Sequence, residues 1–265
     1  MRFQLRKSLF LVPNLITLSS VFCGFYASII VAEANNSDDF YRSTVFIVLA
    51  MFLDTLDGRV ARLTRTQSSL GVQLDSLADV ISFGLAPSLL VYRWSLHQLA
   101  GLGVFVSFCF LAAGVLRLAR FNVLAVSPVG APNKPKAYTL GLPIPAAAGI
   151  LVSLVAANHA LDLPFPGSPV FVMVLVLALS FFMVSTLRFR SFKDLKLNAQ
   201  SVALVLFAII PGILLALRYH ISVTLIWLLG AYMALGVGES FLRLLSRLLD
   251  AKSKNKEYND HPSTP

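Results

Sequence analysis

The sequence predicts an all-α, polytopic transmembrane helical bundle of about eight helices. Apolar residues make up 57% of the 265 residues, and the mean hydropathy is +0.76. Charged residues make up only 13%, well below the roughly 25% of an average soluble domain. An apolar stretch of about 17 to 25 residues can cross a bilayer as a helix. Eight such stretches fall near residues 11–32, 43–61, 74–94, 98–119, 142–160, 169–187, 199–218 and 221–242.

The first stretch follows a basic start and ends at Ala32-Glu33-Ala34, a pattern that resembles a signal-peptide cleavage site. A cleaved signal peptide over residues 1–34 is therefore an alternative. The apolar run from Leu9 to Ala32 is longer than the usual signal-peptide core of about 7–15 residues. A membrane-spanning helix is the favoured interpretation.

The second and third stretches contain four of the chain's thirteen acidic residues. Asp54 and Asp57 are three positions apart, and Asp75 and Asp79 are four positions apart, so each pair shares one helix face. The connection between them, roughly residues 63–71, is short. We therefore expect two antiparallel neighbouring helices whose acidic pairs converge on one site.

The fourth stretch ends in Arg117 and Arg120, which share a helix face, followed by Asn122. A guanidinium there can hold a carboxylate or a phosphate through paired hydrogen bonds. Basic residues that flank a span for topology are the alternative. At the fifth stretch, the prolines of Gly141-Leu-Pro-Ile-Pro145 are expected to bend or break the helix start, because proline removes a backbone donor.

The remaining stretches show no boundary that would indicate a second domain. We expect one transmembrane domain over residues 1–250 and a polar, disordered cytoplasmic tail over residues 251–265. Cys23 and Cys109 have neither metal-site nor redox spacing, which favours small buried thiols.

The basic residues predict the orientation of the bundle. With a cytoplasmic N-terminus, all lysines and arginines except Arg42, Arg93 and Arg218 fall in cytoplasmic segments, as the positive-inside rule requires. The net charge of +9 is thus explained by topology, and no nucleic-acid partner is expected. We predict a multi-pass protein of the cell (inner) membrane with both termini in the cytoplasm.

Four carboxylates at membrane depth require a counter-charge, because an ionised acid there is costly. Oxygen ligands favour hard ions such as magnesium, manganese or calcium. Four carboxylates can hold two ions, and such a pair can clamp a phosphate during an in-line displacement. Arg59, Arg62 and Arg65 add positive charge nearby. Interhelical polar contacts, or a transporter with an acidic cation site, are the alternatives.

Read with its spacing, the segment from Asp54 to Asp79 is D-x2-D-G-x2-A-R-x8-G-x3-D-x3-D. This pattern resembles the signature of the CDP-alcohol phosphatidyltransferase family, and every specified position matches. The resemblance implies a catalytic domain with a six-helix core and two divalent ions, Mg²⁺ or Mn²⁺. It also implies transfer of a phosphatidyl or similar group from a CDP-linked lipid to an alcohol, with release of CMP and an active site facing the cytoplasm.

The resemblance also implies a role for each matching position. Asp54, Asp57, Asp75 and Asp79 are expected to ligate metal, and Asp79 is also expected to be the general base. The positions expected to bind the CDP-lipid are Asn14, Gly58, Ala61, Arg62 and Gly71. Arg117, Arg120 and Asn122 are expected to bind the acceptor or a phosphate.

The segments 12–27, 114–123, 138–149 and 183–195 are similar to the branch of this family that uses L-serine. That similarity implies CDP-diacylglycerol and L-serine as substrates, phosphatidylserine and CMP as products, and eight spans. A sister enzyme that uses glycerol 3-phosphate, inositol or another alcohol is the alternative. The resemblance further implies contact with membrane lipids and a homodimer.

Overall fold

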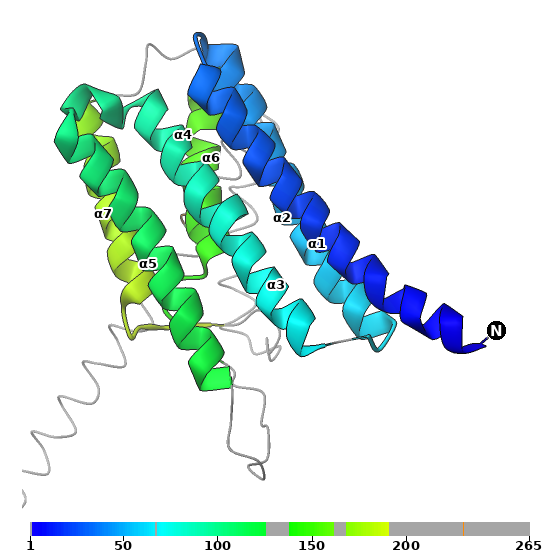
Figure 1. Ribbon diagram of the computed structural model, residues 1–265. Helices are drawn as coiled ribbons and strands as arrows, with labels where there is room; N and C mark the ends of the chain where they lie inside the picture. Colours follow the sequence, from blue (N-terminus) through cyan, green and yellow to red (C-terminus); the bar gives the residue numbers. More distant parts are fainter. Residues whose placement is uncertain (1, 67, 126–137, 162–167, 191–229, 231–265) are drawn as a thin grey trace, which may run out of the picture.

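Helices α1 (Arg2–Glu33) and α2 (Ser37–Leu63) form an antiparallel pair along one side of the computed structural model (Figure 1). The structure describes residues 2–66, 68–125, 138–161 and 168–190, together with residue 230. Asn36 caps α2 by accepting a hydrogen bond from the Asp39 backbone N–H. Asp38 and Asp39 lie in the first turn of α2, where negative charge complements the helix dipole.

The third predicted span is a continuous rod made of three segments. Helix α3 (Ser69–Asp79) leads into the π-helical segment η1 (Val80–Leu85), and η1 leads into α4 (Ala86–Trp94). The expected start at residue 74 was too late. The Ser68 hydroxyl accepts a hydrogen bond from the Gly71 backbone N–H and so caps a helix that begins at Ser69, as serine commonly does at an N-cap.

The fourth span is preceded by a 3-10 turn, η2 (Leu96–Leu99), and by Ala100 with a positive φ of 49°. Helix α5 therefore covers Gly101–Ala125 and not the expected residues 98–119. Helices α6 (Ile144–Ala160) and α7 (Pro169–Val184) follow. The break expected at Gly141–Pro145 is confirmed, because Gly141 has a φ of 75° and Pro143 is the N-cap of α6.

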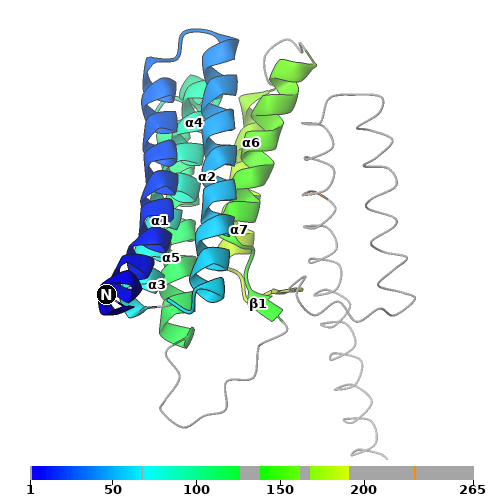
Figure 2. The same cartoon turned by 90° about the vertical axis from the view of Figure 1, so that its right-hand side faces the viewer.

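Two short strands are the exception to an all-helical architecture within the described ranges. Strand β1 (Tyr138–Leu140) pairs antiparallel with β2 (Arg188–Arg190), with Thr139 opposite Phe189. The strands bring the segment before α6 beside the segment after α7, and β1 lies at the end of the bundle near the chain's N-terminus (Figure 2).

Within the described residues, three helical stretches are long and apolar enough to cross a membrane: Leu11–Glu33, Ser69–Trp94 and Gly101–Val123. The apolar helices α6 and α7 are shorter, with 17 and 16 residues. Large apolar side chains such as Phe22, Phe52 and Phe105 are exposed on the outer surfaces of α1, α2 and α5, as expected of helices surrounded by lipid. The polytopic helical membrane architecture predicted from the sequence is confirmed.

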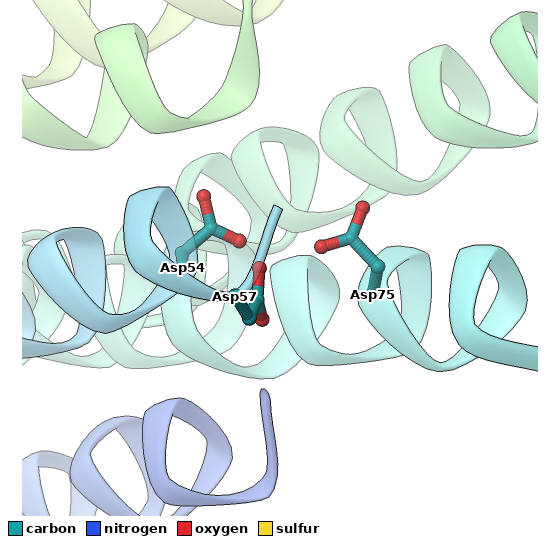
Figure 3. A group of neighbouring side chains, drawn as sticks. All are labelled: Asp54, Asp57 and Asp75. Atoms are coloured by element: carbon teal, nitrogen blue, oxygen red, sulfur yellow. The ribbon is translucent and has the colours of Figure 1, made fainter. Parts of the chain in front are cut away.

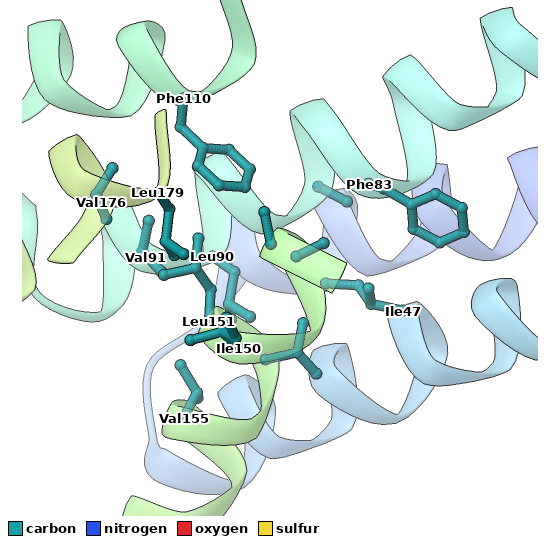
Figure 4. Packing of buried hydrophobic residues seen from close by; sticks show 14 of the residues in the cluster. Ile47, Phe83, Leu90, Val91, Phe110, Ile150, Leu151, Val155, Val176 and Leu179 are labelled. Carbon is teal, nitrogen blue, oxygen red and sulfur yellow. The ribbon is translucent and has the colours of Figure 1, made fainter. Parts of the chain in front are cut away.

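The core of the bundle lies where α4, α5, α6 and α7 meet. Leu90, Phe110, Leu151 and Leu179 are fully buried there, and Figure 4 shows these side chains gathered between the helices. Phe83 of η1 is also fully buried and lies on the side of Ile47 in the same view. Because these residues have no role in polar chemistry, this part of the bundle acts as a scaffold for the polar side described next.

Small and hydroxyl-bearing residues connect α1, α2 and η1. The Ser20 hydroxyl donates to the Ala50 carbonyl of α2, and the Ser82 hydroxyl of η1 donates to the Ser20 carbonyl. Gly24 lies so close to η1 that a Cβ there would be 2.6 Å from the Ser82 Cα. Close backbone approach over small residues, with hydrogen bonds between helices, is typical of packing inside membranes.

At the end of the bundle away from β1, His159 near the end of α6 contacts residues of α2. Its Nδ1 lies 3.1 Å from the Ser37 hydroxyl, its Nε2 lies 3.8 Å from Asp38, and its ring stacks on Tyr41. This cluster joins α6 to the start of α2. The predicted spans at 199–218 and 221–242 and the tail at 251–265 lie outside the described residues.

Candidate active site

A tight turn sets the acidic helices side by side. Helix α2 ends at Leu63, and the Thr64 and Thr66 backbone N–H groups donate back to the carbonyls of Val60 and Ala61. Arg65 has a positive φ of 54°, which turns the chain toward α3. The second and third spans are therefore joined by a short turn, as the sequence predicts.

Three of the four predicted metal ligands meet across this helix pair. Asp54 and Asp57 of α2 and Asp75 of α3 each offer one carboxylate oxygen, and these oxygens all lie within 4.8 Å of one another. Figure 3 shows Asp54 and Asp75 directed toward each other, with Asp57 between them. Asp57 is buried, and the other two are partly buried.

Asp79, the fourth acid, lies one turn farther along α3 and borders the same cluster. Its carboxyl group interacts electrostatically with Asp54, Asp75 and Arg117. Its Oδ1 atom is buried and has no hydrogen-bond partner among the residues that the structure describes. The predicted convergence of the two pairs is therefore observed.

The residues present fit a divalent cation. Carboxylates this close in an apolar bundle repel one another strongly unless a cation lies between them. Their donor atoms are all oxygens, which suit a hard divalent ion. The unpartnered Oδ1 of Asp79 supplies a further donor beside the three clustered acids. The site can thus hold a divalent metal ion through Asp54, Asp57 and Asp75.

A cleft of about 270 Å³ opens beside the acids, between α1, α2 and the start of α3. All five residues expected to bind the CDP-lipid line it, so the structure brings them together. The lining residues are Pro13, Asn14, Thr17, Asp57, Gly58, Ala61, Arg62, Thr66, Ser68, Gly71, Val72 and Asp75.

Small residues keep this cleft open. A Cβ at Gly71 would lie 3.2 Å from the Ser68 hydroxyl and 3.6 Å from the Asn14 Oδ1. A Cβ at Gly58 would lie 3.4 Å from a guanidinium nitrogen of Arg62, so this guanidinium lies over the Gly58 backbone. The Arg62 guanidinium and the Asn14 amide thus line the same cleft as the carboxylates of Asp57 and Asp75. Such a lining suits a ligand bearing phosphates.

Sequence reasoning did not identify Thr17, Thr66 or Ser68 as part of the cleft. Thr17 lies three positions after Asn14, so the same-face rule for helices could have indicated it. The Thr17 hydroxyl donates to the Asp57 carboxylate at 2.6 Å. Thr66 and Ser68 line the cleft because of the conformation of the turn between α2 and α3. No sequence pattern specifies that conformation.

The three residues expected to bind the acceptor or a phosphate do not line the cleft, and they have different surroundings. Arg117 of α5 interacts electrostatically with Asp79. Arg120 donates to the Val184 carbonyl at the end of α7, and Asn122 donates to the Ser76 hydroxyl of α3 at 3.0 Å. Arg120 and Asn122 therefore connect helices, whereas Arg117 lies beside the acids.

The model of the CDP-alcohol phosphatidyltransferase family matches residues 10–184 of this chain. The matched region covers most of α1 and continues to the end of α7, and it contains all the residues of the acidic cluster and the cleft.

Several relatives share one name, CDP-diacylglycerol–serine O-phosphatidyltransferase. The relative from Helicobacter pylori is 39% identical over 203 residues, which are 75% of this chain and 79% of the relative. The relative from Bacillus subtilis is 33% identical over 183 residues, which are 69% of this chain and 91% of the relative. The relative from Saccharomyces cerevisiae is 34% identical over 147 residues, which are 54% and 52% of the two chains.

Proposed function

This chain belongs to the CDP-alcohol phosphatidyltransferase family, and from that premise we propose that it makes phosphatidylserine. The enzyme transfers the phosphatidyl group of CDP-diacylglycerol to the hydroxyl of L-serine and releases CMP. Membership in this family sets aside the cation-transporter alternative. The observation that carries the proposal is a cleft with Asn14, Gly58, Arg62 and Gly71 on its walls that ends at the acidic cluster.

Serine as the acceptor is supported by the relatives and not by the acidic residues. The relatives from Helicobacter pylori and Bacillus subtilis, both named for serine transfer, match 75% and 69% of this chain at 39% and 33% identity. Glycerol 3-phosphate, inositol or another alcohol remains the alternative acceptor, because the D-x2-D to D-x3-D signature is shared by the whole family.

Asp54, Asp57, Asp75 and Asp79 would hold two divalent ions, Mg²⁺ or Mn²⁺. When bound, such ions supply positive charge that neutralises the diphosphate and the departing CMP. The support for this assignment is the close approach of three carboxylates and the buried, unpartnered Oδ1 of Asp79.

The protein's own residues bind the nucleotide and move one proton. Arg62 and Asn14 contact the CDP group, and Gly58, Ala61 and Gly71 leave space for it. Asp79 accepts the proton of the serine hydroxyl as general base. The hydroxyl oxygen then forms a bond to the β-phosphorus, the bond from that phosphorus to the bridging oxygen breaks, and CMP leaves with the electron pair.

Arg117 orients the acceptor in this proposal, which is supported by its interaction with Asp79. A guanidinium there can pair with the carboxylate of serine. Arg120 and Asn122 are assigned to the same acceptor-binding region. Asn122 donates a hydrogen bond to the hydroxyl of Ser76, the residue that follows Asp75. The acyl chains of the bound lipid substrate extend sideways from the site into the bilayer. Serine enters the site from the cytoplasm.

An acceptor panel tests the proposal. The purified chain with CDP-diacylglycerol and Mn²⁺ or Mg²⁺ is expected to release CMP with L-serine and to stop when a chelator is added. A preference for glycerol 3-phosphate or inositol would overturn the choice of acceptor. The absence of CMP release with every alcohol tested would overturn the enzymatic proposal.

We infer direct transfer without a phosphatidyl-enzyme intermediate. Labelled CMP should then enter CDP-diacylglycerol only when the full reaction runs in reverse, so exchange in the absence of serine and phosphatidylserine should not occur. Serine-independent exchange would contradict direct transfer.

A homodimer, which the family resemblance implies, can be measured on the same preparation from its mass in detergent.

A further inference from the structure

Thr17 of α1 contacts a predicted metal ligand on a different helix. Its hydroxyl lies 2.6 Å from Asp57 Oδ2 and 3.0 Å from the Pro13 carbonyl. Both side chains are almost fully enclosed, with Thr17 5% and Asp57 4% exposed. The contact therefore joins α1 to the acidic cluster in a buried setting.

The hydroxyl has one hydrogen to donate, and the geometry favours Asp57 as its acceptor. A distance of 2.6 Å is typical of a hydroxyl that donates to a charged oxygen, and such bonds are stronger than bonds to a neutral carbonyl. The contact with Pro13 is the ordinary one that threonine makes to a carbonyl four positions earlier in a helix. The carboxylate is the shorter and more strongly charged acceptor.

This hydrogen bond constrains the direction of the Asp57 carboxylate. Oδ2 is held by α1 through Thr17, and one carboxylate oxygen of Asp57 lies within 4.8 Å of carboxylate oxygens of Asp54 and Asp75. Partners that hydrogen-bond a metal-ligating carboxylate commonly fix its orientation and tune the metal's affinity. Without the hydroxyl, the side chain would turn more freely and a buried acceptor would lose its donor.

We propose that Thr17 is a positioning residue that orients Asp57 for divalent-metal binding. The inference rests on the proposed function, because it takes Asp57 to be a metal ligand. It concerns a residue of α1 that lies outside the signature spanning Asp54 to Asp79.

Ser20 provides a matched control on the same helix. It lies one turn after Thr17, is 1% exposed and donates from α1 to the Ala50 carbonyl of α2 at 3.0 Å. Ser20 thus makes the same kind of link between the two helices without contacting an acidic residue. Loss of helix packing alone would affect the two positions alike.

The test measures Mn²⁺ binding to the full-length purified protein, without substrates, from the signal of free Mn²⁺ in electron paramagnetic resonance. Thr17→Val keeps the shape of the side chain and removes the hydroxyl, and it is expected to weaken Mn²⁺ binding about 10-fold. Thr17→Ser restores the hydroxyl and should bind as wild type does. Ser20→Ala should also retain wild-type affinity, and thermal unfolding verifies that each variant is folded.

A kinetic measurement separates positioning from chemistry. Thr17→Val should raise the Mn²⁺ concentration needed for half-maximal turnover and should recover turnover when Mn²⁺ is saturating. Wild-type affinity in Thr17→Val, or an equal loss in Ser20→Ala, would overturn the inference while leaving the proposed function intact. Absence of Mn²⁺ binding in the wild type would instead overturn the metal assignment, and this inference with it.

Discussion

Asp79 and Asp57 differ in their contacts, which suggests different tasks for the two carboxylates. Asp79 has a buried oxygen without a partner in the described ranges, whereas Asp57 Oδ2 is held by Thr17. We predict that Asp79→Asn lowers turnover by at least about 100-fold, because general-base catalysis commonly contributes this much or more. Binding of CDP-diacylglycerol should be at least partly retained.

Asp57→Asn is the comparison for that experiment. It should weaken Mn²⁺ binding as well as turnover, because it removes one of three clustered ligands. Turnover is measured from CMP release, and lipid binding is measured by equilibrium titration. Full activity in Asp79→Asn would remove its assignment as the base.

Gly71 limits the width of the cleft. We predict that Gly71→Ala raises the KM for CDP-diacylglycerol several-fold with a smaller effect on kcat, because the new methyl group would enter the space between Ser68 and Asn14. The variant should fold normally, since alanine stabilises a helix by roughly 0.5–1 kcal/mol relative to glycine. Steady-state kinetics with varied lipid substrate provide the measurement.

Gly101→Ala is the matched control, because a Cβ at Gly101 has nothing within 4 Å among the described residues. Its kinetic constants should equal those of wild type. An unchanged KM in Gly71→Ala would show that the wall between α1 and α3 does not contact the nucleotide.

At the level of secondary structure, η1 is the feature closest to the chemistry. It begins directly after Asp79, and a π-helical turn changes the direction in which the preceding residues face relative to those that follow. Such turns are frequently found at functional sites. Ser82 in η1 is anchored to α1 by its hydrogen bond to the Ser20 carbonyl, so α1 helps to set the position of Asp79.

This packing predicts that Gly24→Ala will lower both stability and turnover, although Gly24 does not line the cleft. The added Cβ would lie 2.6 Å from a backbone atom of η1, so η1 would have to shift. We expect a loss of about 1–3 kcal/mol, typical of overpacking, and reduced turnover because Asp79 moves with η1. Thermal unfolding and CMP release measure the two effects.

Ser28→Ala is a suitable control, because the Ser28 hydroxyl donates to the Gly24 carbonyl within α1 itself. It should leave both stability and turnover close to those of wild type. Wild-type turnover in Gly24→Ala would show that η1 and Asp79 are not coupled.

Hydropathy predicted helical structure in each of the first six apolar stretches, which the structure confirms. Within the described residues, three helical stretches are long and apolar enough to cross a membrane. Hydropathy could not predict the π-helical turn at Val80–Leu85 or the close approach of Gly24 to Ser82 within that turn, because it carries no information on either. The convergence of the acids followed from their spacing and the short turn. Thr17 was missed because its contact with Asp57 joins residues 40 positions apart. The hydrogen bond from Arg120 to the end of α7 could not be predicted either, and the role of Arg120 in ligand binding stays a prediction.

Across the whole molecule, the two ends of the bundle differ in chemistry. One end has the cleft, the acidic cluster and the arginines of the turn after α2, whereas the other has the contacts of His159 with Ser37 and Asp38. CDP-diacylglycerol is a membrane lipid and serine is a water-soluble amino acid. The reaction therefore requires an active site at one membrane boundary, and a cleft at one end of the bundle is consistent with this requirement.

The positive-inside rule predicts that this boundary is the cytoplasmic one, because Arg59, Arg62 and Arg65 flank the turn between α2 and α3. We expect a cysteine placed at Ser69 to be labelled by a membrane-impermeant maleimide only after the cells are permeabilised. A cysteine at Asn35, in the connection between α1 and α2, should be labelled in intact cells. Both positions are exposed.

The two cysteine variants are made in a chain whose Cys23 and Cys109 are replaced by alanine. This parent chain must still release CMP. Cys23 is buried and Cys109 is partly buried, so neither substitution removes a group from the cleft. Labelling at Ser69 and protection at Asn35 in intact cells would reverse the orientation. In that case serine would have to reach the acids from the outer side, and the distribution of basic residues would need another cause.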